Sequence, residues 1–180
     1  MNLNLRESIF ISLLVSMLLG GGYVLYIAST YLPMPGMKYV ILAPYLSLII
    51  CALRVLVTNK WAVIRFNIVF AMIMSLISIY MSLAIIITTI LTELTGLVLG
   101  QFASKFKNLI TSALYSFYAV FVSLITLKYI LLTSDIIEIS IIMIISLSLV
   151  GFVLGIFGAR IGEEVGERVR KIVVSDESSL

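Results

Sequence analysis

The sequence predicts an all-α, polytopic membrane protein with six transmembrane helices and both termini in the cytoplasm. Hydrophobic residues make up 62% of the 180 residues and charged residues only 12%, whereas soluble domains average about 45–50% apolar and about 25% charged residues. The apolar residues form long runs, and a helix that crosses the hydrocarbon layer needs about 20 such residues. The basic residues lie between these runs, mostly on one side. We therefore expect a multi-pass protein of the cell membrane, with the lipid bilayer as its surroundings.

The composition also excludes several kinds of chemistry. The chain has no histidine and a single cysteine, Cys51, so it can form no histidine-based triad, no His or Cys zinc site and no internal disulfide. The net charge of +3 comes from Lys and Arg residues at the ends of expected helices rather than from one basic patch. We expect no catalytic residue, no metal or other cofactor and no nucleic-acid partner, so the protein is not expected to be an enzyme.

The first two expected spans cover residues 9–27 and 39–57. The first is longer than the apolar region of about 7 to 15 residues found in a signal peptide, so we interpret it as a transmembrane helix. Pro33, Pro35 and Gly36 predict a loop before the second span. Arg54 and the polar residues 58–60 close the second span.

The remaining chain supplies four more spans. Residues 63–99 are almost unbroken in apolar character and about twice a membrane thickness long, so they must fold back, most plausibly near residues 78–82. The fifth span covers residues 109–127 and the sixth residues 139–157. A short cytoplasmic helix extends the sixth span, giving a single domain over residues 1–174 and a frayed tail over 175–180.

The basic residues sort between the two membrane faces. Only Lys38 and Lys128 lie on the face opposite the termini, and the other ten lie on the terminal side. Because Lys and Arg are retained in the cytoplasm, both termini are expected inside. The ten are Arg6, Arg54, Lys60, Arg65, Lys105, Lys107, Arg160, Arg168, Arg170 and Lys171.

Glu93 is the only carboxylate placed well within a span. A charge near the bilayer centre costs about 2.5 to 3.5 kcal/mol on insertion scales, so such residues usually face the bundle interior and mark functional positions. Glu93 shares a helical face with Thr89 and Gly96. The alternative is a structural role, in which Glu93 bonds a neighbouring helix or pairs with Arg54 or Arg65.

Tyrosines gather towards the outer face, which is typical of an interfacial aromatic belt. They could instead line an outward-facing pocket of stacking surfaces with a few polar groups, the usual form of a small-molecule site. The candidate substrate-binding residues on this interpretation, together with Glu93, are Tyr26, Tyr45, Tyr80, Tyr118, Lys128 and Glu138.

Two rows of small residues favour close helix approach. One row lies on the first span, and the other lies on the sixth span and its extension. Internal packing explains either row about as well as an external partner does, and the apolar stripe of the C-terminal extension could lie in solvent, on the membrane surface or against a subunit. The first row is Ser8, Ser12, Ser16 and Gly20, and the second is Gly151, Gly155, Gly158, Gly162 and Gly166.

This layout resembles the substrate-binding S components of energy-coupling factor (ECF) vitamin transporters, nearest to the thiamine-precursor (hydroxymethylpyrimidine) group. The matching stretches are residues 11–29, which contain the first small-residue row, Ala52-Leu-Arg54, the Glu93 region with Gly96, and residues 148–158. The resemblance implies six helices with cytoplasmic ends and a small-residue row on the first helix that packs against a coupling subunit.

The resemblance also implies a function. An S component captures a small vitamin or vitamin precursor from the outer face, with residues 31–38 as a lid, and works with a coupling transmembrane subunit and two ATPase subunits. The chain has no glycine-rich phosphate loop, so ATP hydrolysis must occur in a partner. Two alternatives remain open: a structural or regulatory subunit of a membrane complex that binds no ligand, and a small channel or proton-coupled carrier that uses Glu93.

Overall fold

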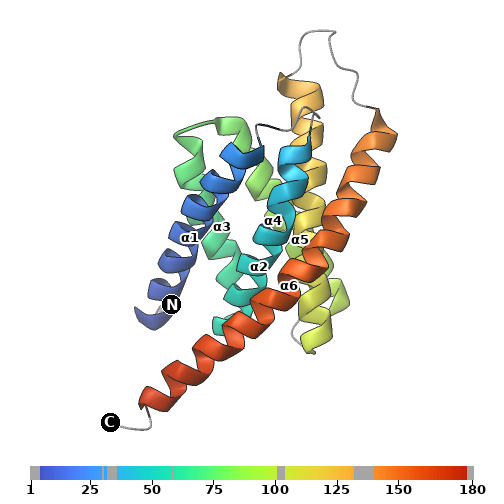
Figure 1. Cartoon of the computed structure of the whole chain (residues 1–180). Coiled ribbons are helices and arrows are strands. Elements are labelled where there is room, and N and C mark those ends of the chain that lie inside the picture. Colours follow the sequence, from blue (N-terminus) through green and yellow to red (C-terminus); the bar gives the residue numbers. More distant parts are fainter. Residues whose placement is uncertain are drawn as a thin grey trace.

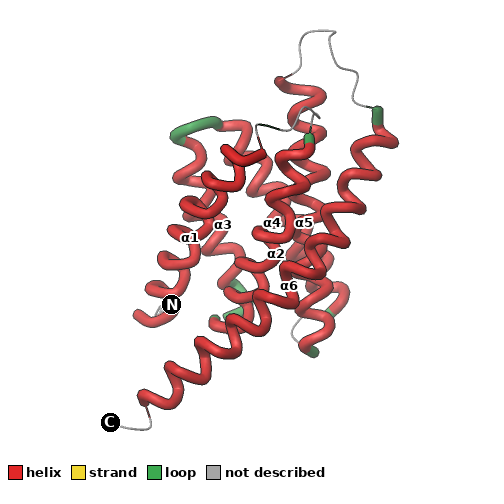
Figure 2. The backbone as a smooth tube through the Cα atoms, in the orientation of Figure 1, coloured by secondary structure: helices red, strands yellow, loops and turns green. Residues whose placement is uncertain are grey.

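The protein is built from helices, as seen in a computed structural model that describes residues 5–29, 31, 36–57, 59–100, 104–131 and 140–177 (Figure 1). Figure 2 shows helices and a few short turns, with no strand in these ranges. An all-α architecture is therefore confirmed for the described residues. The elements are α1 (Leu5–Ser29), α2 (Met37–Leu56), α3 (Ala62–Ser75), α4 (Ile79–Leu99), α5 (Lys105–Thr126), a π-helical turn (Leu127–Leu131) and α6 (Ile141–Glu177).

Five of these helices are long and apolar enough to cross a membrane, namely α1, α2, α4, α5 with the turn that follows it, and α6. α3 is also apolar but has 14 residues, fewer than the about 20 that a full crossing requires. The fold is thus compatible with a polytopic membrane protein. α6 continues as a helix to Glu177, and residues 178–180 of the expected tail lie outside the described residues.

The expected reversal within residues 63–99 is present. α3 ends at Ser75 and α4 begins at Ile79. The turn therefore covers residues 76–78 and overlaps the predicted segment, residues 78–82, only at Ser78. Leu76 keeps a helical backbone with φ of −68°, and Ser78 is extended with φ of −157°. Because neither residue needs a positive φ, the chain reverses here without glycine or proline.

α2 occupies the middle of the bundle and packs against α1, α3, α5 and α6, whereas α4 packs against α3 and α5. One apolar cluster joins α1, α2 and α3 around Leu53 and Phe66, which are fully buried. A second cluster joins α2, α5 and α6 around Ala43, Val120 and Ile144. Any functional group on the inner faces of α2 is therefore held from several sides.

The glycines of α6 are used for internal packing. A Cβ at Gly158 or Gly162 would overlap the backbone carbonyl of Pro44 or Leu48 in α2. A Cβ at Gly151 would lie 2.9 Å from Val120 Cγ2 in α5. Small residues let helices in lipid approach until their backbones touch, and this row does so within the chain.

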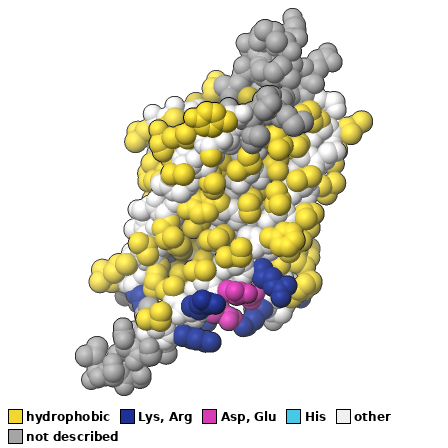
Figure 3. Space-filling view, in the orientation of Figure 1, with side chains coloured by type: hydrophobic (Ala, Val, Ile, Leu, Met, Phe, Trp, Pro, Cys, Tyr) yellow, Lys and Arg dark blue, Asp and Glu magenta, His cyan; other side chains and the backbone are white. Residues whose placement is uncertain are grey.

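Charged side chains gather at the end of the bundle that holds the termini, as seen on the face drawn in Figure 3. The rest of that face is largely hydrophobic. At this end Lys105 of α5 forms an ion pair with Glu167 of α6. The gathering agrees with the charge sorting that was read from the sequence, and the surface between the two ends suits a lipid environment.

Substituting Gly158 by Ala is expected to destabilise the protein by about 1 to 3 kcal/mol, because the added methyl group forces α6 away from the Pro44 carbonyl. Thermal unfolding of the detergent-purified protein measures the effect. Gly20→Ala is the matched control, since nothing lies within 4 Å of a Cβ there and Ala favours a helix over Gly by about 1 kcal/mol. Equal melting temperatures for the two variants would contradict the described α2–α6 contact.

Candidate functional site

An ion pair lies buried between α2 and α4. Arg54 Nη2 donates to Glu93 Oε1 at 2.7 Å, and the two side chains are only 4% and 11% exposed. Arg65 instead forms an ion pair with Glu7 of α1, at 3.7 Å. Of the partners considered for Glu93, Arg54 is therefore the one that the structure shows. Each charge offsets the desolvation cost of the other, so removing one alone is costly.

A second buried polar contact joins α5 to α3. Tyr115 Oη donates to Asn67 Oδ1 at 2.7 Å, and both residues are almost fully buried. The Asn67 amide also donates to the Val63 carbonyl at 3.0 Å. The sequence reasoning singled out neither residue, although Asn67 is the only Asn or Gln inside an expected span. A polar amide in such a run could have been noticed as a candidate interhelical bond.

Buried hydroxyl groups surround these two contacts. The Thr92 hydroxyl donates to the Thr88 carbonyl at 2.8 Å in α4, and the Thr111 hydroxyl donates to the Lys107 carbonyl at 2.8 Å in α5. Ser47 of α2 donates to the Ser112 carbonyl at 3.0 Å. The bundle therefore buries polar groups beside its two apolar clusters, and the hydroxyl groups among them bond mainly to helix carbonyls.

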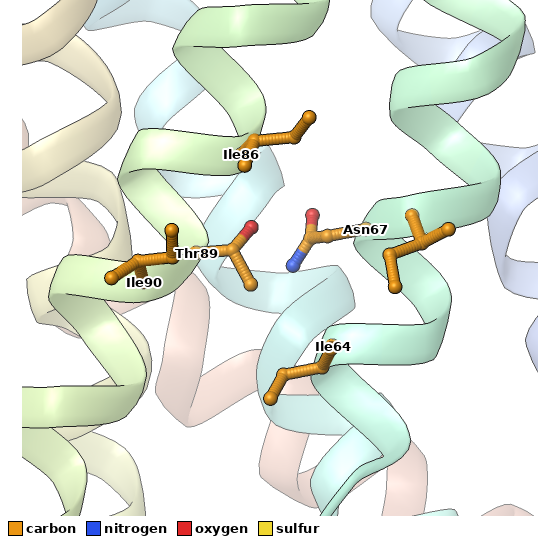
Figure 4. A pocket seen from close by; sticks show the side chains of 6 residues that line it. Ile64, Asn67, Ile86, Thr89 and Ile90 are labelled. Atoms are coloured by element: carbon orange, nitrogen blue, oxygen red, sulfur yellow. The ribbon is translucent and has the colours of Figure 1, made fainter.

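A pocket of about 160 Å³ lies between α3 and α4. Asn67 of α3 and Thr89 of α4 point toward one another across it, between isoleucines from both helices (Figure 4). Ile68, Ile86 and Ile90 are about half exposed, so the pocket opens to the side of the bundle, where lipid would lie. The lining residues are Ile64, Asn67, Ile68, Ile86, Thr89 and Ile90.

The predicted substrate-binding tyrosines contact different neighbours. Tyr45 Oη donates to the Met17 carbonyl at 2.5 Å, and Tyr118 Oη lies 2.9 Å from Thr95 Oγ1. Tyr80 is 43% exposed at the start of α4.

Two of the predicted residues lie nearer the outer loops. The Lys38 ammonium lies over the Tyr26 ring, 5.5 Å from its centre, and Lys128 lies over Tyr129 at 5.4 Å. Glu138 falls outside the described residues. No described interaction joins two of the predicted set, so a shared pocket of these residues stays a prediction.

The small-residue row of α1 differs from that of α6, because it faces outward. Ser12, Ser16 and Gly20 are exposed and Ser8 is half-buried. Nothing lies within 4 Å of a Cβ built at Gly20, and the Ser16 hydroxyl donates to the Ser12 carbonyl of its own helix at 3.0 Å. Within the described chain this face is uncovered. The stripe on the C-terminal part of α6 is also exposed, at Ile161, Val165 and Ile172.

Replacing one member of the buried Arg54–Glu93 pair is expected to destabilise the protein more than replacing both members. Arg54→Met or Glu93→Leu alone leaves a buried charge and is expected to lose about 3 to 5 kcal/mol, whereas the double variant recovers most of this loss. Thermal unfolding in detergent gives the double-mutant cycle. Lys105→Ala, which removes an exposed ion pair at the same end, serves as the control with little change. Additive losses in the cycle would mean that the pair is not coupled.

Comparison of the chain with protein-family models, with curated proteins and with solved structures gives no significant match.

Proposed function

We propose that this chain is the membrane-embedded substrate-binding component of an ECF-type importer. It captures a small vitamin or vitamin precursor, of the thiamine or hydroxymethylpyrimidine kind, from the outer face. It then depends on a coupling transmembrane subunit and two ATPase subunits for transport. Six membrane crossings and cytoplasmic termini form part of this proposal, with α3 crossing together with the residues that flank it.

The observation that supports a membrane partner most strongly is the contrast between the two small-residue rows. The glycines of α6 are covered by α2 and α5, whereas Ser12, Ser16 and Gly20 of α1 are exposed. α1 packs only against α2 and α3 among the described helices, so it lies at the edge of the bundle. A face of small side chains allows a helix of another subunit to approach closely in the membrane.

In this proposal, tyrosines from three helices bind a small heterocyclic ligand. Tyr26 and Tyr45 come from α1 and α2, and Tyr118 comes from α5. Aromatic rings with a few polar groups are the usual lining of small-molecule sites. Lys38 already lies over the Tyr26 and Tyr39 rings, so cationic and aromatic groups meet near the expected lid.

A structural or regulatory membrane subunit is the second candidate. The Arg54–Glu93 pair favours it, because Glu93 then serves helix association instead of ligand binding. The same pair weighs against a proton-coupled carrier built on Glu93, which would have to break this buried 2.7 Å contact in every cycle.

A thermal-shift screen of the purified chain separates these candidates. Thiamine or hydroxymethylpyrimidine at about 100 times its dissociation constant is expected to add roughly 2.7 kcal/mol of stability through mass action. Tyr45→Ala or Tyr118→Ala is expected to reduce the shift, while Tyr23→Ala, at an exposed position of α1, serves as the control. Absence of a shift across a panel of vitamins and precursors would instead favour the structural subunit.

Ser16→Leu tests the outward face of α1. The new side chain is expected to leave the melting temperature almost unchanged, because Ser16 is exposed, but to lower cellular uptake at least about tenfold by preventing close helix approach. Val153→Leu, at a 52% exposed position of α6, is the matched control. Normal uptake by the Ser16→Leu variant would remove the α1 face from the mechanism.

A further inference from the structure

The four helices α2, α3, α4 and α5 form a ring in which each helix packs against its two ring neighbours and, within the described residues, not against the helix opposite. α2 contacts α3 and α5, and α4 contacts α3 and α5. In the described ranges, no Cα of α2 lies within 8 Å of a Cα of α4, and the same holds for α3 and α5. Only long side chains can therefore connect the opposite members of the ring.

Both diagonals of the ring are bridged by polar side chains. The Arg54–Glu93 pair joins α2 to α4 at 2.7 Å, and the Tyr115–Asn67 hydrogen bond joins α5 to α3 at 2.7 Å. We refer to these two contacts as the crossed links. The crossed links span the ring centre in both directions, and the residues that form them are buried.

The crossed links lie in the half of the ring nearest the charged end. Arg54 precedes the end of α2 by two residues, Glu93 precedes the end of α4 by six, and Asn67 follows the start of α3 by five. At about 1.5 Å per residue, their Cα atoms lie roughly 3 to 9 Å from those helix ends. Tyr115 lies ten residues into α5, and helical side chains lean toward the N-terminus, which brings its hydroxyl to the same level.

The buried interior beside the crossed links contains hydroxyl groups that can hydrogen-bond to water. Buried hydroxyl groups on α4 and α5 face the bundle core, and basic residues surround the end of the ring that lies nearest. Hydroxyl groups can hydrogen-bond to water that enters, whereas an apolar interior stays dry. The buried hydroxyl residues of this part of the two helices include Thr88, Thr92, Thr111, Ser112 and Ser116.

We propose that the crossed links form a latch that closes the centre of the α2–α5 ring at the charged end, and that parting the Arg54–Glu93 link admits water to these buried hydroxyl groups. The latch goes beyond the proposed function, since it concerns access from the charged end and holds for a solute-binding or a structural subunit alike. The Arg54–Glu93 link holds α2 to α4 and the Tyr115–Asn67 link holds α5 to α3, so loss of either one loosens one diagonal of the ring.

The reactivity of Cys51 can be used to measure this opening. It is the only cysteine in the chain and is fully buried. It lies three residues before Arg54, on the same face of α2, and its thiol lies beside Ser112 of α5. Its reaction with a charged, water-soluble maleimide therefore measures how often water reaches the interior near the latch.

The experiment uses the full chain in liposomes and follows the rate of Cys51 labelling. Arg54→Ala and Glu93→Ala are each expected to raise the rate at least about tenfold, which corresponds to about 1.4 kcal/mol in an opening equilibrium. Tyr115→Phe, which removes only the second link, is expected to raise it by a smaller factor. Lys105→Ala, outside the ring centre, is expected to leave the rate unchanged, and labelling after denaturation gives the total reactive thiol.

A charge swap separates a latch from general loosening of the bundle. The double variant Arg54→Glu with Glu93→Arg restores a pair across the same diagonal and is expected to return labelling toward the wild-type rate. The proposal is overturned by unchanged labelling in the single variants, by a swap that labels as fast as they do, or by a rise seen only with uncharged, membrane-permeant N-ethylmaleimide. Where the single variants do not fold, Tyr115→Phe and the swap decide the outcome.

Discussion

The close contact between α6 and α2 is the constraint on which the rest of the bundle depends. Lipid tails are as apolar as leucine, so burial alone does not drive helices together in a membrane, and tight packing must do so. Gly158 and Gly162 let α6 rest on the backbone of α2 at Pro44 and Leu48. This contact fixes α2 in the middle of the molecule, and α2 in turn presents Ser47 and Arg54 to α5 and α4.

Much of the fold could be predicted from the sequence because long hydrophobic runs, and the polar, Gly and Pro residues that separate them, are local signals. The six apolar segments, the reversal before Ile79 and a candidate partner for Glu93 all follow from such signals. The sequence could not say which small-residue row is internal, because periodicity identifies a helix face but not the neighbour that covers it. Gly158 and Ser16 lie in similar rows, yet one is covered and the other is exposed.

The candidate site was predictable only in part for a related reason. Glu93 stands out because a charge inside a span is costly, whereas Tyr115 looks like any aromatic residue in an apolar helix. Its role depends on Asn67, which lies 48 positions earlier in the chain, and no local pattern joins the two. The tyrosines show the reverse case. Their distribution along the sequence suggested one shared pocket, but in the structure Tyr45 bonds to Met17 and Tyr118 lies beside Thr95.

The length of α6 has a consequence for how the molecule relates to its bilayer. Its 37 residues span about 55 Å, whereas the hydrocarbon layer is about 30 Å thick. The glycine contacts with α2 continue to Gly166, and beyond them the helix projects past the bundle (Figure 1). To fit this length within the hydrocarbon layer, α6 would have to tilt by about 57°, beyond the range of about 0 to 40° seen for transmembrane helices. In a bilayer the C-terminal turns of α6 therefore lie in the aqueous phase, and they carry the basic residues Arg168, Arg170 and Lys171 past the lipid headgroups.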